Sequence, residues 1–113
     1  MDEGIILAGE IDRWPSKTVM IQILENAGLS IIEGRYSIRI KDCEYFGFHE
    51  YGGDLGDPVI EADASSLEKM LDDASRVSAA LAAANLRHRF ELYSENNDKM
   101  VGYLHHCWPQ KFE

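Results

Sequence analysis

Two segments of the chain space their apolar residues as a helix does. In residues 16–27, apolar side chains recur every three or four positions behind Ser16, a residue type that favours the N-cap of a helix. Gly28 follows where the pattern stops, and glycine is favoured just beyond a helix because it adopts a left-handed backbone without strain. The rival interpretation is a strand, because residues 18–23 are rich in β-branched side chains. We favour the helix.

The second helical segment is the longer one, and its start carries the stronger signal. The tetrapeptide Ser65-Ser66-Leu67-Glu68 matches a capping box, in which the Ser65 hydroxyl accepts from the Glu68 N–H and the Glu68 carboxylate bonds back to the Ser65 N–H. Beyond it, an apolar face repeats at helical spacing until Asn85, which suits the end of a helix. The expected members of that face are Leu67, Met70, Leu71, Ala74, Val77, Ser78 and Leu81.

The other apolar segments have the short runs or the two-residue alternation that are typical of strands. Before the first turn, for example, Tyr36, Ile38 and Ile40 alternate with polar residues, as in a strand with one face buried. Tight turns are expected at Asp42-Cys43 and at residues 96–98, and each joins two strands into an antiparallel hairpin. The expected strands are residues 4–8, 29–41, 44–51, 89–93 and 100–108, and residues 59–62 are expected to form a short extended piece.

These elements predict an α+β fold, a mostly antiparallel sheet of about five strands with two helices packed on one face. The length suits a single domain over residues 1–113 with one hydrophobic core. The apolar runs are far shorter than the roughly 20 residues of a membrane helix, and the acidic start is unlike a signal peptide. Two cysteines, Cys43 and Cys107, are too few for a disulfide framework. We therefore expect a cytoplasmic protein that meets no membrane.

The charge of the chain is large and local. The formal net charge is −9 at pH 7. Residues 42–73 contain ten acidic residues and one basic residue, Lys69, whereas the rest of the chain is balanced. Such a chain lacks the surplus of Lys and Arg that phosphate binding needs, so direct nucleic-acid binding is disfavoured and a basic protein partner is favoured. The alternative is that these acids only keep the surface soluble.

Candidate catalytic chemistry is sparse. The chain contains no nucleophile elbow, no phosphate-binding glycine pattern and no calcium-loop spacing, so we expect no catalytic residue, no metal and no cofactor. The alternative is a small enzyme or ligand-binding domain with a pocket lined by His88, His105 and His106. His105 and His106 are adjacent in an expected strand and point to opposite faces, so the two cannot ligate one metal together.

The segment best suited to binding is residues 44–57, which joins aromatic residues to acids on an expected strand and a glycine-rich loop. Aromatic rings beside charged groups are typical of protein interfaces, because the rings supply contact area and the charges supply steering. Alternation places Phe46 and Phe48 in the core and the other aromatic residues outside. The predicted partner-binding residues are Glu44, Tyr45, His49, Glu50, Tyr51, Asp54 and Asp57.

Three functions remain open. In size, acidity and lack of a catalytic signature the chain is similar in kind to bacterial immunity proteins, which neutralise nucleic-acid-cutting or otherwise cationic toxins; no motif carries this likeness. The expected function is therefore a non-catalytic inhibitor or immunity-type protein that docks on a basic partner such as a toxin. The alternatives are the histidine-lined enzyme or ligand-binding domain, and a protein that pairs with a second copy of itself through an open sheet edge.

Overall fold

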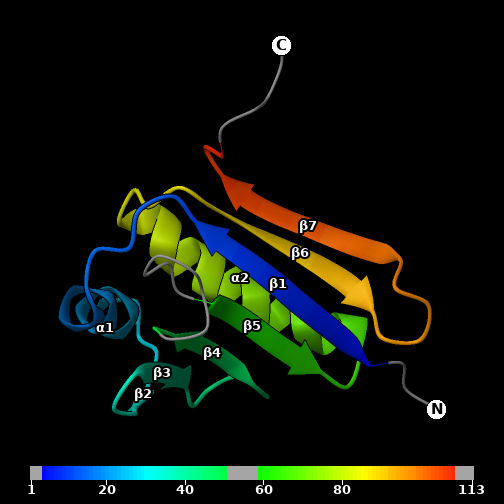
Figure 1. Ribbon diagram of the computed structural model, residues 1–113, viewed down its shortest axis with the longest axis horizontal. Coiled ribbons are helices and arrows are strands. Elements are labelled where there is room, and N and C mark those ends of the chain that lie inside the picture. Colours follow the sequence, from blue (N-terminus) through cyan, green and yellow to red (C-terminus); the bar gives the residue numbers. More distant parts are fainter. Residues whose placement is uncertain (1–3, 51–58, 109–113) are drawn as a thin grey trace.

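The centre of the fold is a seven-stranded sheet with the strand order β2-β3-β4-β5-β1-β6-β7 (Figure 1). The structure is a computed structural model that describes residues 4–50 and 59–108. Every pair of neighbouring strands is antiparallel. The α+β class is confirmed, and the sheet has more strands than the predicted five. The strands are β1 (Ile5–Ile11), β2 (Ile31–Glu33), β3 (Ser37–Ile40), β4 (Phe46–His49), β5 (Val59–Ala64), β6 (His88–Ser94) and β7 (Met100–His106), and the helices are α1 (Lys17–Asn26) and α2 (Leu67–Ala83).

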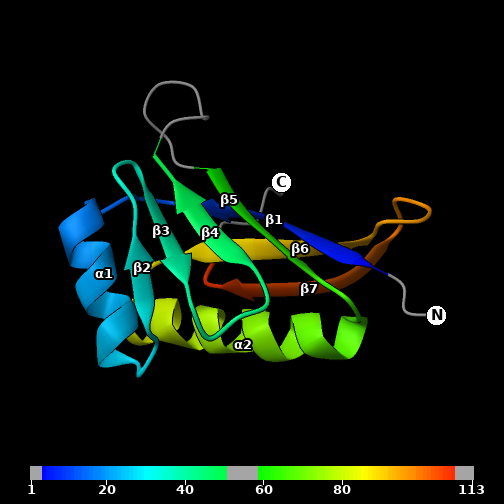
Figure 2. The ribbon, with the colours of Figure 1, turned by 90° about the horizontal axis from the view of Figure 1, so that it is seen from below.

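The two helices lie on one side of the sheet and leave its other face uncovered by any described element (Figure 2). α2 packs beneath β5, β1, β6 and β7, and α1 packs against α2 and against the β2–β3 end of the sheet. The strands alternate accordingly, with one side chain in the core and the next turned outward. The largest core side chains are Phe46, Phe48 and Phe90. We call the uncovered side of the sheet the open face.

The predicted strand over residues 29–41 is wrong in one respect, because it consists of two strands, β2 and β3, joined by a turn. The Lys17 ammonium of α1 donates to the carbonyl oxygens of Gly34 at 2.6 Å and of Arg35 at 2.8 Å. A lysine far away in the sequence thus provides hydrogen bonds to backbone oxygens of the turn, which make no hydrogen bonds between β2 and β3. Tyr36 was expected on the buried side but lies in this turn and is 40% exposed, whereas the isoleucines after it are buried as predicted.

The ends of the helices follow local rules, with one shift. Ser16 caps α1 as predicted, because its Oγ accepts a backbone N–H of the first turn at 3.1 Å. Gly28 has a φ of 89°, a conformation that glycine adopts without strain. At α2 the predicted cap is wrong by one position: the Oγ of Ser66, and not that of Ser65, accepts from the Lys69 N–H at 3.1 Å.

The buried face of α2 is also turned relative to the predicted one. Leu67 and Leu71 are exposed, whereas Asp73 is buried. Asp73 accepts from the Lys69 ammonium at 2.8 Å and from the Glu44 N–H at 2.9 Å, so its carboxylate oxygens are satisfied. A polar residue on the buried face of α2 therefore binds the loop that leads into β4.

Candidate functional site

The open face presents aromatic rings and charged groups to solvent. Because the strands are in register, one residue from each strand falls in a single row across the sheet. That row consists of Ile32, Arg39, Gly47, Glu61, Ala8, Glu91 and Tyr103. The neighbouring rows add Asp63, Ile6, Tyr93 and Met100 on one side, and Glu10, Arg89 and His105 on the other.

Two adjoining hollows at one end of the open face form what we call the acidic groove. Their volumes are about 420 Å³ and about 470 Å³, and they share Ile6 and Asp63 as lining residues. No Lys, Arg or His is among the residues described as lining them. Its four carboxylates belong to Glu44, Glu61, Asp63 and Glu95. The groove is therefore a concave anionic surface with an apolar residue at its centre.

Strand β5 positions two of these carboxylates. Its burial alternates along the strand, so Glu61 and Asp63 both turn to the open face. β5 lies between β4 and β1, and the register sets Asp63 opposite Ile6 of β1. An acid and an exposed isoleucine thus lie side by side although they are far apart in sequence.

Backbone contacts position the other two carboxylates. The Glu95 N–H donates to the Gly4 carbonyl oxygen at 2.9 Å, which holds the end of β6 beside the start of β1. Glu44 lies in the loop before β4, and its Oε1 accepts from both the N–H and the hydroxyl of Ser65 at 3.2 Å. Ser65, which the sequence predicts as the N-cap of α2, therefore orients the Glu44 carboxylate in the groove.

Tyr45 and His49 form a cluster with Glu61 at the edge of the groove. The Tyr45 hydroxyl is 3.1 Å from His49 Nε2 and 3.3 Å from Glu61 Oε2, and His49 Nε2 lies 3.2 Å from the same carboxylate oxygen. The Arg39 guanidinium lies over the Tyr45 ring at 5.4 Å. Burial, followed by the Glu61 carboxylate, raises the pKa of Tyr45. Its phenol thus remains a hydrogen-bond donor at neutral pH.

Farther along the open face the acids are compensated. Arg89 contacts Glu10 and lies 3.6 Å from a Glu91 oxygen, and its guanidinium lies 5.1 Å from the centre of the Trp108 ring. The Tyr93 hydroxyl donates to Glu91 at 2.8 Å, a hydrogen bond that raises the pKa of Tyr93. Among the described residues, the groove carboxylates of Glu44, Asp63 and Glu95 form no ion pair, whereas that of Glu61 lies beside His49.

The predicted partner-binding residues are brought together only in part. Tyr45 and His49 meet on the open face, and Glu44 lines the groove. Glu50 lies at the opposite end of β4 from Glu44, where its N–H donates to the Tyr36 carbonyl oxygen at 2.8 Å. Three predicted residues, Tyr51, Asp54 and Asp57, lie outside the described residues.

Sequence reasoning did not assign Ile6, Glu61, Asp63 or Glu95 to the site. The alternation in residues 59–64 gives the outward direction of Glu61 and Asp63. Their proximity to Ile6 and Glu95 depends on the strand order, which leaves no signal in the local sequence.

The acidic stretch 42–73 is divided between the two sides of the molecule. Glu61 and Asp63 lie on the open face, whereas Asp72 and Asp73 belong to α2 on the other side. Asp72 pairs with Arg76 at 3.2 Å, and Asp42 accepts from the Ser30 N–H at 2.6 Å. Some acids of the stretch are therefore bound by local partners and do not contribute to the groove. The fourth groove acid, Glu95, comes from outside the stretch.

The three histidines of the alternative function do not share a pocket in the described part of the chain. His88 is buried on the helix side, where its Nδ1 donates to the Leu86 carbonyl oxygen at 2.9 Å and its Nε2 accepts from the Ser78 hydroxyl at 2.7 Å. The His106 ring stacks on it at 6.2 Å, whereas His105 lies on the open face. Because both nitrogens of His88 are bonded within the fold, the geometry supports a structural role for this ring.

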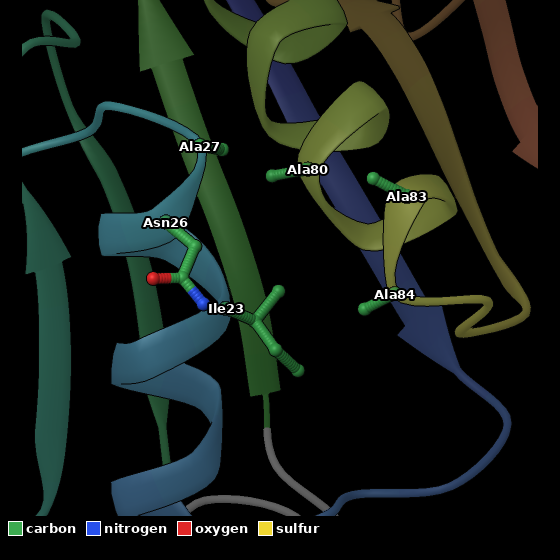
Figure 3. Close-up of a pocket in the computed structure, with 6 residues that line it drawn as sticks. All are labelled: Ile23, Asn26, Ala27, Ala80, Ala83 and Ala84. Carbon is green, nitrogen blue, oxygen red and sulfur yellow. The ribbon is translucent and has the colours of Figure 1, made fainter.

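A third hollow, of about 220 Å³, lies between the ends of α1 and α2 and carries little chemistry (Figure 3). Its lining combines methyl groups from both helices with one polar side chain, Asn26. No titratable group is among its lining residues, which are Ile23, Asn26, Ala27, Ala80, Ala83 and Ala84.

Comparisons with known proteins add no assignment. No protein family, curated protein or solved structure matches the chain significantly. Within residues 4–50 and 59–108, no three side chains of His, Cys, Asp or Glu are placed to hold a metal ion together. Neither described helix is long and apolar enough to cross a membrane.

Proposed function

We propose that this chain is a small, acidic, non-catalytic binding protein that docks on a basic partner protein through its open face. The acidic groove receives Lys or Arg side chains of the partner, and the neighbouring rings supply contact area. The partner is a cationic protein such as a toxin, and the chain acts as its inhibitor in the manner of an immunity protein. The proposed location is the cytoplasm, where the thiols of Cys43 and Cys107 stay reduced.

The observation that carries the proposal is the set of four carboxylates around one groove that has no Lys, Arg or His among its described lining residues. A concave surface lined by charge of one sign concentrates the field and raises the association rate of oppositely charged groups. Exposed charges are screened beyond about 8 Å at physiological ionic strength, so the attraction acts mainly at close approach. The groove therefore attracts most strongly those Lys or Arg side chains of the partner that enter it. Basic residues elsewhere on the partner contribute less to binding.

The apolar part of the groove favours the same ligand. Ile6 is 38% exposed and lies next to Asp63, and the Tyr45 ring lines the same hollow. Lys and Arg side chains combine an apolar stem with a charged head. Such a side chain can place its stem on Ile6 and its head among the carboxylates, which makes it a better fit than a small inorganic cation.

The proposal is tested by an NMR titration of the full chain with an oligo-arginine peptide. We expect the largest shift changes at backbone amides of Ile6, Tyr45 and Asp63, and a loss of binding as salt is raised. Shift changes confined to the acidic residues of α2, or no saturable binding at low salt, would refute the groove as the docking site.

Charge reversal at the groove gives a matched comparison. The double variant Glu61→Lys, Asp63→Lys is expected to weaken peptide binding at least about tenfold, equivalent to about 1.4 kcal/mol. Its control, Glu25→Lys with Asp72→Lys, makes the same change in net charge on exposed helical positions and is expected to retain most of the affinity. Equal losses in both variants would show that only net charge matters. In the native host, a partner captured by the wild type and by the control, but not by the groove variant, would support the inhibitor class.

A further inference from the structure

The two edges of the sheet differ in length and protection. The edge strand β2 has three residues, and its Glu33 pairs with Lys17 of α1 at 3.3 Å. The other edge strand, β7, has seven residues. It contacts β6 and α2, and no described element lies beyond its outer side (Figure 1). One long row of backbone N–H and C=O groups is therefore presented to solvent.

The composition of β7 lacks most of the usual protection of an edge strand. Native edges carry charged residues or proline, which discourage pairing with another chain. β7 contains no Asp, Glu, Lys, Arg or Pro, although the chain as a whole carries a charge of −9. Its Met100, Val101 and Tyr103 are 55%, 40% and 46% exposed. One irregularity is present, a register shift near the start of the strand at Leu92/Tyr93.

We propose that β7 pairs antiparallel with β7 of a second copy of this chain. The uncharged composition of β7 suits a second copy, because self-pairing sets no like charges opposite each other in the strand pair although each copy carries −9 in total. A strand that pairs with itself around a two-fold axis makes the most contacts when the axis passes its middle residue. In β7 that residue is Tyr103, so the register sets Tyr103 opposite its own copy.

The pairing has a defined consequence for the open face. Side chains directly opposite each other in an antiparallel pair point to the same side of the sheet. Both open faces therefore lie on the same side of the extended sheet, and the helices of both copies lie on the other. The dimer presents two acidic grooves in one direction and suits a partner with two basic sites. The pairing itself does not depend on the proposed function of the groove.

Sedimentation velocity of the full chain over a wide concentration range tests the pairing. We expect the mass to rise from monomer to dimer with concentration, and Tyr103→Glu to shift this transition to at least about tenfold higher concentration. The matched control is Ile32→Glu, which adds the same charge at the opposite end of the same row on the open face. It is expected to leave the transition unchanged.

Oxidative cross-linking tests the register without weakening the strand. In a Cys107→Ser background, Tyr103→Cys sets two thiols opposite each other at a spacing that a disulfide can bridge, and Ile32→Cys serves as control. A disulfide-linked dimer of the first variant alone is expected. A wild type that stays monomeric at every concentration, or a dimer that cross-links through position 32, would overturn the proposal and leave β7 as an edge for a chain of other sequence.

Discussion

A single buried carboxylate connects the core to the groove. Asp73 is 1% exposed and accepts from the Lys69 ammonium and the Glu44 N–H. Because an unpaired charge in the core is costly, these two bonds hold the loop before β4 on α2 and so keep Glu44 at the groove. Burial, followed by the Asp73 carboxylate, raises the pKa of Cys43 to about 12. The Cys43 thiol therefore stays protonated and unreactive at neutral pH.

His88 is expected to make the stability of the fold depend on pH. Burial lowers the pKa of its ring below the ordinary value of 6.5. The unfolded chain therefore binds a proton at this residue at a higher pH than the folded chain does. The contribution of the neutral His88 ring to the free energy of unfolding is complete above pH 6.5. As the pH falls from 6.5 toward the pKa of the folded state, that free energy decreases by up to about 1.4 kcal/mol per pH unit. Urea unfolding at a series of pH values measures the slope.

Two variants separate His88 from the other groups that titrate in the same range. His88→Gln removes the buried titration and is expected to flatten the slope, although it lowers stability at every pH. His105→Gln removes an exposed ring on the open face whose charge is the smallest of the causes acting on the pKa of His88, so it is expected to change the slope less than His88→Gln does. Identical slopes in all three proteins would mean that the buried ring is not the source.

At the scale of elements, the start of α2 distinguishes two adjacent serines. Ser66→Ala removes the acceptor of the Lys69 N–H and is expected to lower the free energy of unfolding by about 1 kcal/mol. Ser65→Ala removes only an exposed hydroxyl contact to Glu44, so a change within about 0.5 kcal/mol is expected. Urea unfolding of both variants measures the difference. If Ser65→Ala lowers the free energy of unfolding more than Ser66→Ala does, Ser65 is the N-cap of α2, as the sequence predicts.

These elements show where sequence reasoning succeeds. The cap at Ser16 and the β6–β7 hairpin depend on neighbours in the chain, so local patterns predict them. The break between β2 and β3 depends on Lys17, which lies 17 residues before the Gly34 carbonyl it binds. The cap of α2 depends on Glu44, which engages Ser65 from another loop and leaves Ser66 to the helix.

At the scale of the whole molecule, strand order decides which residues meet in the groove. Alternation alone gives the outward direction of Tyr45 and His49, and both were predicted to bind a partner. The groove also needs β1 between β5 and β6, because this order brings Ile6 beside Asp63. Hairpin patterns cannot supply that order, since β1 and β5 are separated by most of the first half of the chain.

The groove is expected to lower the stability of the isolated protein, because it adds negative charge to a chain that already carries −9. Asp63 and Glu95 are exposed and form no ion pair within residues 4–50 and 59–108. The double variant Asp63→Asn, Glu95→Gln is therefore expected to gain about 0.5 kcal/mol in urea unfolding at low salt, and the gain is expected to shrink as salt screens the repulsion. Asp72→Asn, which breaks the pair with Arg76, is the control and is expected to gain nothing. A gain of equal size at high salt would point to a local packing effect, whereas a loss would mean that the groove carboxylates stabilise the fold.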